Sequence, residues 1–442
     1  MVRQSSPRLL TLQVDNLTSE GLGVARRGRD VYFVPGALPG EEVEVSLAER
    51  RHKVQYTHLK RILKPSPERV EPSCPHYQRC GGCHLQHLSY SAQVQAKQAR
   101  VAREFQRAGV SVTEWAPPLT AEPWHYRRKA RLGVRYSQAK QQVYLGFREA
   151  GSSHLTDIDQ CAVLIEHPLL HWQRWRQFLR DWPRRAELTQ IEVLQTDQAL
   201  VLTLRLLKRL DETSQQSLQA FVDQVFVEQP ETTLPVQLWV KYHKDEPSQP
   251  LRSDYAPLHY PVDGAPLAVH PDDFIQVNGA INALMVQQAM AWLQPQRGEL
   301  IADFFAGHGN FTMALARREA QVLALEGQVT MVTRLQQQAQ QQGLEIQASC
   351  VDLSQAGGLV GLPDLSAVLL DPPRAGAEAV VEHLLDEAVN RILYVACDAA
   401  TLTRDLRRLT QGGYRVVKAG IMDMFPQTHH VETMVLLTRV GK

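Results

Sequence analysis

Three kinds of hydrophobic pattern follow one another along this chain. Residues 8–64 contain short runs rich in β-branched side chains, separated by turns that carry Gly or Pro, which predicts a small closed or nearly closed β-barrel. Residues 68–270 show no single period. From about residue 271, continuous apolar runs alternate with helical stretches. Strands buried on both faces have such runs, so this last part predicts a doubly wound α/β domain.

The first section is expected to end at Pro65-Ser-Pro67. In the middle section, the alanine-rich and charged stretch 90–108 predicts a helix, and strands are expected around 126–148. We also predict a hairpin that turns at Thr196–Gln198 and a helix at 211–225. We therefore expect three domains, whose ranges are 1–66, 67–270 and 271–442, with the helix at 90–109 packing on the third.

The third section gives the clearest alternation of strands and helices. We predict strands at 300–303, 322–326, 367–371 and 391–395, helices at 311–318, 329–342, 377–388 and 401–410, and a final antiparallel pair at 414–418 and 432–438. In such folds, ligands bind beyond the carboxyl ends of the parallel strands. Candidate chemistry is therefore sought at those strand ends.

Charge adds local rather than global information. Lys and Arg number 48 against 47 Asp and Glu, which excludes a uniformly basic surface. A basic patch lies within 121–150 and is either a solvated face or a nucleic-acid contact. Its members are Arg127, Arg128, Lys129, Arg131, Arg135, Lys140 and Arg148. The predicted turns of the barrel also carry arginines, which would suit an RNA-binding platform.

The first residues, Met-Val-Arg-Gln-Ser-Ser-Pro-Arg, have no apolar core of signal-peptide length, and no apolar run is long enough to span a bilayer. We therefore expect a cytoplasmic protein without a membrane segment, acting as a monomer. In a reducing compartment, the six cysteines should be metal ligands, nucleophiles or buried fillers rather than disulfides.

A glycine-bearing loop, Asp303-Phe-Phe-Ala-Gly-His-Gly-Asn310, follows a predicted buried strand and precedes a helix. Glycines there let the backbone turn tightly and approach a nucleotide-type ligand. Glu326 ends the next strand, where a carboxylate can accept both ribose hydroxyls, and Asp352 follows the strand after it. The loop lacks a full G-x-G-x-x-G pattern and a Walker lysine, so S-adenosylmethionine is favoured over NAD and ATP. Gln276 could also reach the cofactor.

A thiol and two carboxylates stand at later strand ends. Cys397 ends a predicted buried strand, Asp371 ends its neighbour, and Glu432 arrives with the last antiparallel pair. Carbon 5 of uracil is too weakly nucleophilic to attack a sulfonium methyl group unaided, but thiolate addition at carbon 6 activates it, and a base must then remove the carbon 5 proton. Asp371-Pro-Pro also occurs in amino-methyltransferases, which need neither the thiol nor the late Glu. The set therefore favours uracil methylation.

Four other cysteines suggest a metal site. Cys74, Cys80 and Cys83 have x5 and x2 spacings, and Cys161 is a distant fourth. Four sulfur ligands suit either zinc or an iron–sulfur cluster, and the spacing alone leaves both open. Cys350 is most simply a buried filler.

These motifs together resemble the bacterial RNA 5-methyluridine methyltransferases, most closely the branch that modifies 23S rRNA at a uridine of the 1939 type. Gly21–Arg26 through Val43 resembles the TRAM domain, an OB-fold-like RNA-binding barrel of that family. The resemblance implies a Rossmann-like S-adenosylmethionine-dependent methyltransferase domain, preceded by the barrel and an α+β iron–sulfur central domain. It implies 23S rRNA as the partner.

The resemblance also assigns residues. It implies that Cys397 is the nucleophile and Glu432 the base, with Asp371 in the active centre. The cofactor contacts that it implies are Gln276, Phe305, Asn310, Glu326, Asp352 and Asp371. It makes Cys74, Cys80, Cys83 and Cys161 the ligands of a 4Fe–4S cluster. The tRNA-specific relatives are expected to lack the barrel and the cluster, so both features favour 23S rRNA.

One departure from the family pattern stands beside the nucleophile. The family has Ser-Cys-Asn-Pro, whereas this chain has Ala396-Cys-Asp-Ala399. A negative charge at Asp398 is expected to raise the pKa of the thiol. A non-catalytic RNA-binding relative is therefore one alternative. Methylation of another rRNA uridine or of tRNA is a second, independent one.

Overall fold

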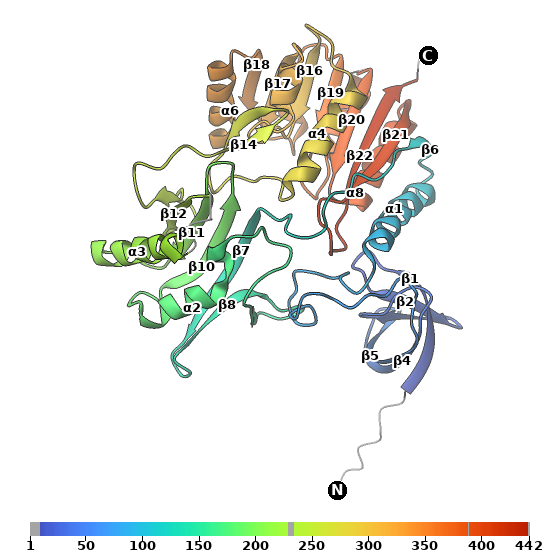
Figure 1. The fold of residues 1–442 in the computed structure, drawn as a ribbon. Helices are drawn as coiled ribbons and strands as arrows, with labels where there is room; N and C mark the ends of the chain where they lie inside the picture. The colour runs from blue at the N-terminus through green and yellow to red at the C-terminus, as the bar shows by residue number, and fades with distance from the viewer. Residues whose placement is uncertain (1–8, 229–233, 388, 441–442) are drawn as a thin grey trace. The chain divides into compact units, whose positions relative to one another are not determined.

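The computed structural model describes residues 9–228, 234–387 and 389–440. The N-terminal residues 1–8 and the last residue of the predicted helix 377–388 lie outside these ranges. The chain forms two compact units, one made of residues 1–100 with 425–430 and the other of 101–424 with 431–442. Each unit is described by itself (Figure 1).

The first unit contains the predicted barrel. Five strands close in the order β1-β2-β3-β5-β4. The strands are β1 (Leu9–Leu17), β2 (Gly23–Arg27), β3 (Asp30–Val34), β4 (Glu42–Arg51) and β5 (Val54–Lys64). Alternate residues such as Leu12, Val14, Val43 and Val45 face inward and form its core, as strand periodicity requires. The strand β5 was not recognised from the pattern, because its charged residues interrupt the apolar alternation.

A buried ion pair joins the barrel to the segment that follows it. The Glu41 side chain has no exposed surface, and its two carboxylate oxygens accept bonds from Arg69 Nε at 2.6 Å and Nη2 at 2.8 Å. Burial alone would raise the pKa of Glu41, but Arg69 and the amides of Leu38 and Ser66 outweigh it, so the pKa is lowered. This carboxylate therefore holds the barrel loop and the chain beyond Pro65 together.

Arg69→Ala should destabilise the barrel by about 2–4 kcal/mol, because it leaves the buried Glu41 charge without its partner. Hydrogen exchange of barrel amides in the full-length protein measures this local stability without assuming one unfolding transition. Arg61→Ala is the control, since its ion pair with Glu44 leaves Arg61 69% exposed and should be worth less than about 1 kcal/mol. Equal effects of the two variants would contradict the prediction.

Helix α1 (Tyr90–Arg107) follows the cysteine loop and confirms the helix expected at 90–108. The second unit contains a seven-stranded sheet in the order β13-β12-β11-β10-β7-β8-β9. Its strands are β7 (Lys129–Ser137), β8 (Gln142–Arg148), β9 (Leu155–Asp157), β10 (Leu188–Gln195), β11 (Leu200–Leu206), β12 (Val236–Lys241) and β13 (Gln249–Pro250). The hairpin β10–β11 turns where the sequence predicted it.

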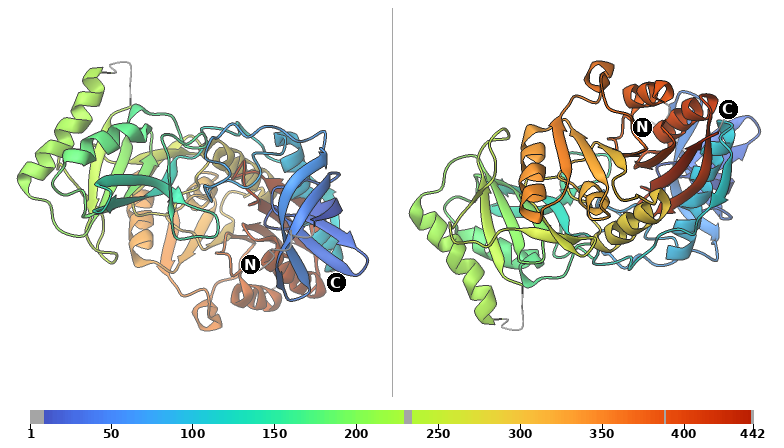
Figure 2. Two further views of the ribbon diagram at one scale, coloured as in Figure 1. Left: turned by 90° about the horizontal axis from the view of Figure 1, so that it is seen from below. Right: turned by 90° about the horizontal axis from the view of Figure 1, so that it is seen from above.

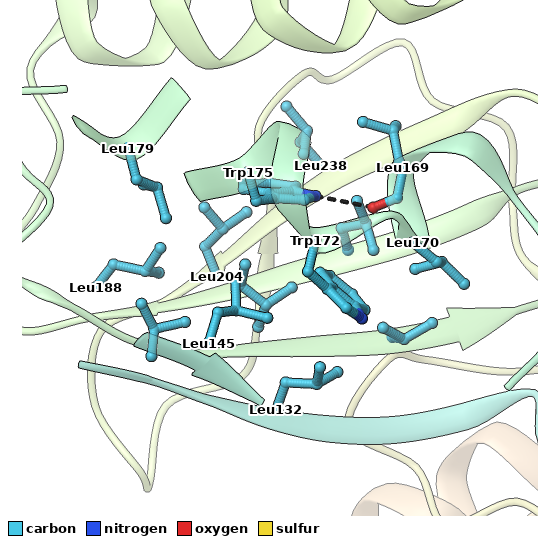
Figure 3. Close-up of a cluster of buried hydrophobic side chains, with 14 of the residues drawn as sticks. Leu132, Leu145, Leu169, Leu170, Trp172, Trp175, Leu179, Leu188, Leu204 and Leu238 are labelled. Carbon is cyan, nitrogen blue, oxygen red and sulfur yellow. Dashed lines mark hydrogen bonds between the residues drawn. The ribbon is translucent and has the colours of Figure 1, made fainter. Parts of the chain in front are cut away.

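One face of this sheet carries an apolar core. The helices α2 (Trp172–Asp181) and α3 (Glu212–Glu228) and the short 3-10 turn η1 (Pro168–Leu170) supply side chains that pack on inward-facing strand residues. Figure 3 shows Trp172 and Trp175 among the leucines of this core. Trp175 Nε1 donates a hydrogen bond to the Leu169 carbonyl at 2.9 Å. Burial of two tryptophans and many leucines stabilises this sheet through the hydrophobic effect. The helix α2 was not predicted, because its polar residues mask a short apolar stripe.

The doubly wound sheet has eight strands in the order β18-β17-β16-β19-β20-β22-β21-β6. The strands are β16 (Leu300–Phe304), β17 (Gln321–Glu326), β18 (Ile346–Cys350), β19 (Ala367–Leu370), β20 (Arg391–Ala396), β21 (Tyr414–Met422), β22 (Glu432–Arg439) and β6 (Val112–Trp115). Its first five members are parallel, and the order reverses between β16 and β19. Ligands of such sheets bind at that reversal.

Helices flank this sheet (Figure 2). They are α4 (Gly279–Leu293), α5 (Thr312–Ala316), α6 (Val329–Gln342), α7 (Glu378–Asp386) and α8 (Ala399–Gln411), with η2 (Ala356–Leu359) between β18 and β19. The small hairpin of β14 (His259–Val262) and β15 (Ala265–Ala268) precedes α4. The helix α4 was missed, because its apolar residues extend around most of the helix and leave no clear stripe.

None of the helices within the described ranges has both the length and the apolar character that a membrane crossing needs.

Candidate active site

The predicted cofactor loop joins β16 to α5 in a strained conformation. Phe305 has a φ of 64°, which costs a non-glycine residue on the order of 1 kcal/mol or more. Gly309 has a φ of 108°, and a Cβ there would lie 2.7 Å from Leu335 Cδ1. The Cβ of a residue replacing Gly307 would meet open space. The backbone is therefore held in a shape that leaves room beside Gly307.

Glu326 stabilises that shape from the end of β17. One of its carboxylate oxygens accepts the Gly307 amide at 3.0 Å, and the other accepts the Gln328 amide at 3.0 Å. Asp352 lies just beyond β18, exposed, and accepts bonds from Ser354 and Gln355, which lower its pKa. The two carboxylates therefore follow neighbouring strands, as the sequence predicted, and each retains lone pairs for a ligand.

Asn310 and Gln276 lie near the start of α4. The Asn310 and Asn282 amides form two reciprocal hydrogen bonds, each of 2.9 Å, which join the cofactor loop to this helix. Gln276 is buried, and its carbonyl accepts a bond from Arg128 Nε at 2.9 Å. Asn278, two residues later, caps α4 by accepting the Ile281 amide. The backbone of the segment before α4 is thus held by the bond from Arg128 and by the Asn278 cap.

Sequence reasoning missed the groups that support this segment. The Arg128 guanidinium stacks over the Tyr260 ring at 4.2 Å, and the Tyr260 hydroxyl pairs with His308 Nε2 at 2.8 Å. Burial lowers the pKa of His308 to about 4, so its ring is neutral. The assignment of Arg128 to a basic surface patch was wrong, because its side chain is buried.

Asp303 is a further carboxylate where the strand order reverses, between β16 and β19. It is the next-to-last residue of β16, is buried, and accepts a 2.6 Å bond from the Thr312 hydroxyl. Burial raises its pKa to about 7, with Asp371 and Glu326 adding to the effect. The hydrogen bond from Thr312 also connects the strand to the first residue of α5.

Cys397, Asp371 and Glu432 interact at the carboxyl edge of the sheet. Leu370 pairs with Tyr394 on β20, so Asp371 and Cys397 both follow neighbouring strand ends. The strand β22 is antiparallel to β20, and its Thr433 pairs with Ala396, which brings Glu432 to the same edge. The three side chains that the sequence placed at separate strand ends are therefore neighbours.

Burial and neighbouring charges shift the pKa values of these three groups. Burial raises the pKa of Asp371 to about 7, and burial with the charge of Asp371 raises that of Glu432 to about 8. Burial, then Glu432 and Asp371, raise the pKa of the Cys397 thiol to about 11. Arg374 opposes the shifts of Cys397 and Glu432. The protein groups around Cys397 therefore favour its protonated thiol on balance. An additional cation nearby would favour the thiolate.

A second polar network holds the loop that carries Asp371 and Arg374. The buried Asp405 carboxylate accepts the Tyr394 hydroxyl at 2.7 Å and the Ala377 amide at 3.0 Å. A Cβ at Gly376, whose φ is 82°, would lie 2.7 Å from that carboxylate. The loop after β19 is thereby bonded to α8 and to β20, the strand that precedes Cys397.

Asp398, the departure beside the nucleophile, caps α8. Its Oδ1 accepts the amides of Ala400 and Thr401, both at 3.0 Å. The carboxylates that raise the pKa of Cys397 are instead Glu432 and Asp371. Asn and Asp are equally good helix caps, so the Asp398 change preserves the local structure.

Asp398→Asn should leave methyl transfer within about threefold of wild type, since the cap is retained. Asp398→Ala should cost about 1 kcal/mol of local stability, because two amides of α8 lose their acceptor. Initial rates and hydrogen exchange of α8 amides measure the two effects. A large gain in the rate of Cys397 alkylation in Asp398→Asn would contradict this account, because it would show that the charge acts on the thiol.

The cysteine loop belongs to the first unit. Cys74, Cys80 and Cys83 are half-buried, and the loop folds back on itself through bonds from the Tyr77 amide to the Cys74 carbonyl and from the Cys80 amide to the His76 carbonyl. Cys161 belongs to the second unit and packs against the core of the seven-stranded sheet. Across the described ranges, no set of three or more His, Cys, Asp or Glu side chains is gathered as a metal ion requires. Cys350, expected to be buried, is exposed.

The tRNA (uracil-5-)-methyltransferase family matches residues 89–354 and 361–440 of this sequence. The chain belongs to this family. Among its relatives, the 23S rRNA (uracil(1939)-C(5))-methyltransferase of Pseudomonas putida is 39% identical, over 96% of this chain and 92% of its own length. The enzyme of the same name from Aeromonas salmonicida is 35% identical, over 98% of this chain and 97% of its own. The family resemblance found from the motifs is confirmed.

A solved structure shares the fold over nearly the whole chain. The tRNA (uracil-54, C5)-methyltransferase of Pyrococcus abyssi, in complex with S-adenosyl-L-homocysteine, has a TM-score of 0.74 and 22% identity, over 97% of this chain and 100% of its own. The predicted Rossmann-like methyltransferase fold with an N-terminal barrel is therefore confirmed.

The same comparison corrects one expectation. At 97% coverage, the match to a tRNA enzyme must include most of the barrel strands between residues 9 and 64. The barrel was expected to separate rRNA enzymes from tRNA enzymes, and that inference was wrong. A barrel that binds RNA through its backbone and shape can serve either RNA.

Proposed function

We propose that this protein transfers a methyl group from S-adenosylmethionine to carbon 5 of a uridine in 23S rRNA, at a position equivalent to 1939. The observation that carries the proposal is that strand pairing brings Cys397, Asp371 and Glu432 to one edge of the sheet, where the two carboxyl groups raise the pKa of the thiol. The glycine-bearing loop lies where the strand order of the same sheet reverses. A thiol and a carboxyl group are the nucleophile and base that the reaction needs. Relatives named for this activity match nearly the full length.

In the proposed reaction, the Cys397 thiolate forms a bond to carbon 6 of the uracil, and the electrons of the 5,6 double bond pass to the ring carbonyl as an enolate. Carbon 5 then takes the methyl group, and the donor leaves as a neutral thioether. Glu432 removes the carbon 5 proton. The electron pair of that carbon–hydrogen bond restores the double bond as the carbon–sulfur bond breaks and Cys397 is released.

Nearby positive charges favour the reactive, deprotonated forms of Cys397 and Glu432. Arg374 is the protein cation that lowers the pKa values of both Cys397 and Glu432. The positive sulfonium of the donor would act in the same direction and disappears once the methyl group has moved. In our proposal Asp371 bonds to the N3 edge of the uracil and orients it. Phe305, Asn310, Glu326, Asp352, Gln276 and Asp371 are the proposed cofactor contacts.

Acceptor identity tests this proposal. Total RNA from a strain that lacks the gene is incubated with the purified protein and labelled S-adenosylmethionine, and the 23S, 16S and transfer RNA are then separated. We expect label in 23S rRNA alone. Label in tRNA alone would favour the activity for which the Pyrococcus abyssi neighbour is named. RNA binding without label in any fraction would favour a non-catalytic relative.

We also propose that Cys74, Cys80, Cys83 and Cys161 bind a 4Fe–4S cluster in a central domain spanning 67–270. Four thiolates are the usual ligands of such a cluster, and the family resemblance tilts the choice from zinc to iron. The half-buried setting of the four cysteines suits a group that avoids water. No step of the methyl transfer passes through it.

Iron and acid-labile sulfide assays on protein purified without oxygen test the cluster. We expect four of each per chain, and their loss in Cys161→Ser with Cys350→Ser as the matched control. Stoichiometric zinc without sulfide would contradict the cluster while leaving the methyl transfer proposal intact.

A further inference from the structure

Tyr260 acts on two parts of the proposed cofactor site. Its hydroxyl pairs with His308 Nε2 at 2.8 Å, and its ring supports the Arg128 guanidinium, whose central carbon lies 4.2 Å from the ring centroid. Tyr260 is 1% exposed and His308 is 4% exposed. Loss of a hydrogen bond between buried groups leaves a polar atom unpaired, so the Tyr260 hydroxyl has a larger energetic effect than one that faces water.

The partner of that hydroxyl stands in the middle of the cofactor loop. His308 lies between Gly307 and Gly309, whose φ angles are 59° and 108°. Glycine adopts many backbone conformations, so a side-chain bond from the residue between two glycines restricts the loop to fewer shapes. The Gly307 amide, one residue before His308, donates to Glu326 at 3.0 Å. The bond at His308 therefore acts on the part of the loop that meets a proposed cofactor contact.

Tyr260 can hold this loop because its own hairpin is anchored. Tyr260 belongs to β14, which pairs with β15. On β15, the Ala268 amide donates to Gln338 Oε1 of α6 at 2.6 Å, and Gln338 Nε2 donates to the Ala268 carbonyl at 3.4 Å. On β14, the Val262 carbonyl accepts a bond from Arg317 Nη1 at 2.7 Å, just after α5. The hairpin is therefore bonded on both strands to elements that flank the doubly wound sheet.

The ring of Tyr260 acts on the second part of the site through Arg128. The stacked guanidinium donates from Nε to the Gln276 carbonyl at 2.9 Å, and the Arg128 amide donates to the Val277 carbonyl at 2.9 Å. A Cβ at Gly279, the first residue of α4, would lie 3.4 Å from Arg128 Nη1. The face of an aromatic ring attracts a cation that lies over it. Tyr260 therefore helps to fix the side chain that holds the Gln276 backbone.

We propose that Tyr260 is a positioning residue for S-adenosylmethionine, which holds the glycine-bearing loop and the Gln276 segment in the shape that binds the cofactor. The inference rests on the proposed function. Loss of the hydroxyl should allow the loop to adopt other conformations, and the fraction of protein that can bind the cofactor then falls. Apparent affinity falls by the same factor, whereas a complex that has formed is unchanged. The KM for S-adenosylmethionine should therefore rise without a fall in kcat.

Tyr260→Phe in the full-length protein tests the proposal, because phenylalanine keeps a ring under Arg128 and removes only the hydroxyl. We expect the Kd for S-adenosylhomocysteine, measured by calorimetry, and the KM for S-adenosylmethionine to rise about 5- to 30-fold. The kcat and the KM for RNA should stay within about twofold of wild type. Tyr255→Phe is the matched control, since the Tyr255 hydroxyl accepts the Leu238 amide at 3.0 Å in the seven-stranded sheet. It should leave all four constants within about twofold of wild type.

His308→Leu removes the same bond from the side of the loop and provides the test if Tyr260→Phe does not fold. It should raise the same two constants. Adding Tyr260→Phe to His308→Leu should change them by less than about twofold further, because both substitutions remove one shared bond.

Three results would overturn the proposal. They are unchanged cofactor affinity in both single variants, a fall in kcat with the KM for the cofactor unchanged, and effects that multiply in the double variant. Calorimetry needs no RNA acceptor. A wild-type protein that binds S-adenosylhomocysteine but methylates no uridine would therefore refute the proposed function, while the affinities of the variants would still decide the role of Tyr260.

Discussion

Replacing Cys397 by alanine should abolish methyl transfer to uridine, with a fall of at least about 1,000-fold. The thiol is the group that adds to carbon 6, and no water or neighbouring carboxylate can replace a sulfur nucleophile there. Cofactor affinity should stay within about threefold of wild type, because the bond from the Gly307 amide to Glu326 that shapes the cofactor loop does not involve the thiol. Initial rates and calorimetric titration with S-adenosylhomocysteine measure the two quantities.

Cys350→Ala provides the matched control for this variant. Cys350 is an exposed cysteine that ends another strand of the same sheet, and its removal should leave the rate unchanged. A covalent adduct with RNA should form in wild type and in Cys350→Ala, and not in Cys397→Ala. Persistent methylation in Cys397→Ala would refute the thiol mechanism.

Replacing Glu432 by glutamine should stop the reaction one step later. Glutamine keeps the shape of the side chain but cannot accept the carbon 5 proton, so the methylated adduct should accumulate while turnover falls about 100- to 10,000-fold. The amount of adduct that survives denaturation, and the methyl label it carries, measure this directly. An unlabelled adduct would mean that Glu432 acts before methyl transfer, contrary to the proposed order.

The same substitution should stabilise the folded protein in alkaline solution. The pKa of Glu432 is raised from 4.5 to about 8 by burial and by Asp371. The folded state therefore holds the proton more tightly than the unfolded chain, and the stability that this contributes is lost as pH rises from about 4.5 through 8. At pH 9, Glu432→Gln should gain up to about 5 kcal/mol.

Melting curves of wild type and Glu432→Gln between pH 5 and pH 9 test this sign. The melting temperatures should converge at low pH and separate at high pH, with the variant higher. Glu319→Gln is the control, because the Glu319 side chain is exposed and forms a surface ion pair with Arg297. A variant that is less stable than wild type at pH 9 would show that the charged Glu432 is stabilised in the fold.

Much of the fold could be predicted because its signals are local. Continuous apolar runs such as Ala367–Leu370 mark strands buried on both faces, and the sequence order of Asp371, Cys397 and Glu432 placed each at a strand end. The rule that ligands bind beyond the carboxyl ends of parallel strands then brought these residues to one edge. Sequence spacing was enough for this part of the site.

The remaining features depend on contacts between distant segments. The helix α4 has apolar residues on most sides, so its pattern gave no period, although Asn282 from it pairs with Asn310. Asp405 supports the loop after β19 from a helix that begins after Cys397. Tyr260 and His308 are 48 residues apart. A single sequence contains no signal that such polar residues share one buried network.

Asp398 shows the opposite error, in which a neighbour in sequence is not the partner in space. It follows Cys397 in the sequence, so its negative charge was expected to raise the pKa of the thiol. The structure directs its oxygen to the amides of α8, and the charges that act on the Cys397 thiol come from residues 371, 374 and 432. Proximity along the chain is a poor guide to electrostatic coupling when a helix cap competes for the carboxylate.

The most direct test of the central claim uses 23S rRNA labelled with tritium at carbon 5 of its uridines. The account predicts that wild type releases one tritium for each methyl group incorporated, at a single nucleotide, and that Cys397→Ala releases none. Methyl incorporation without tritium release, or release that persists in Cys397→Ala, would contradict it.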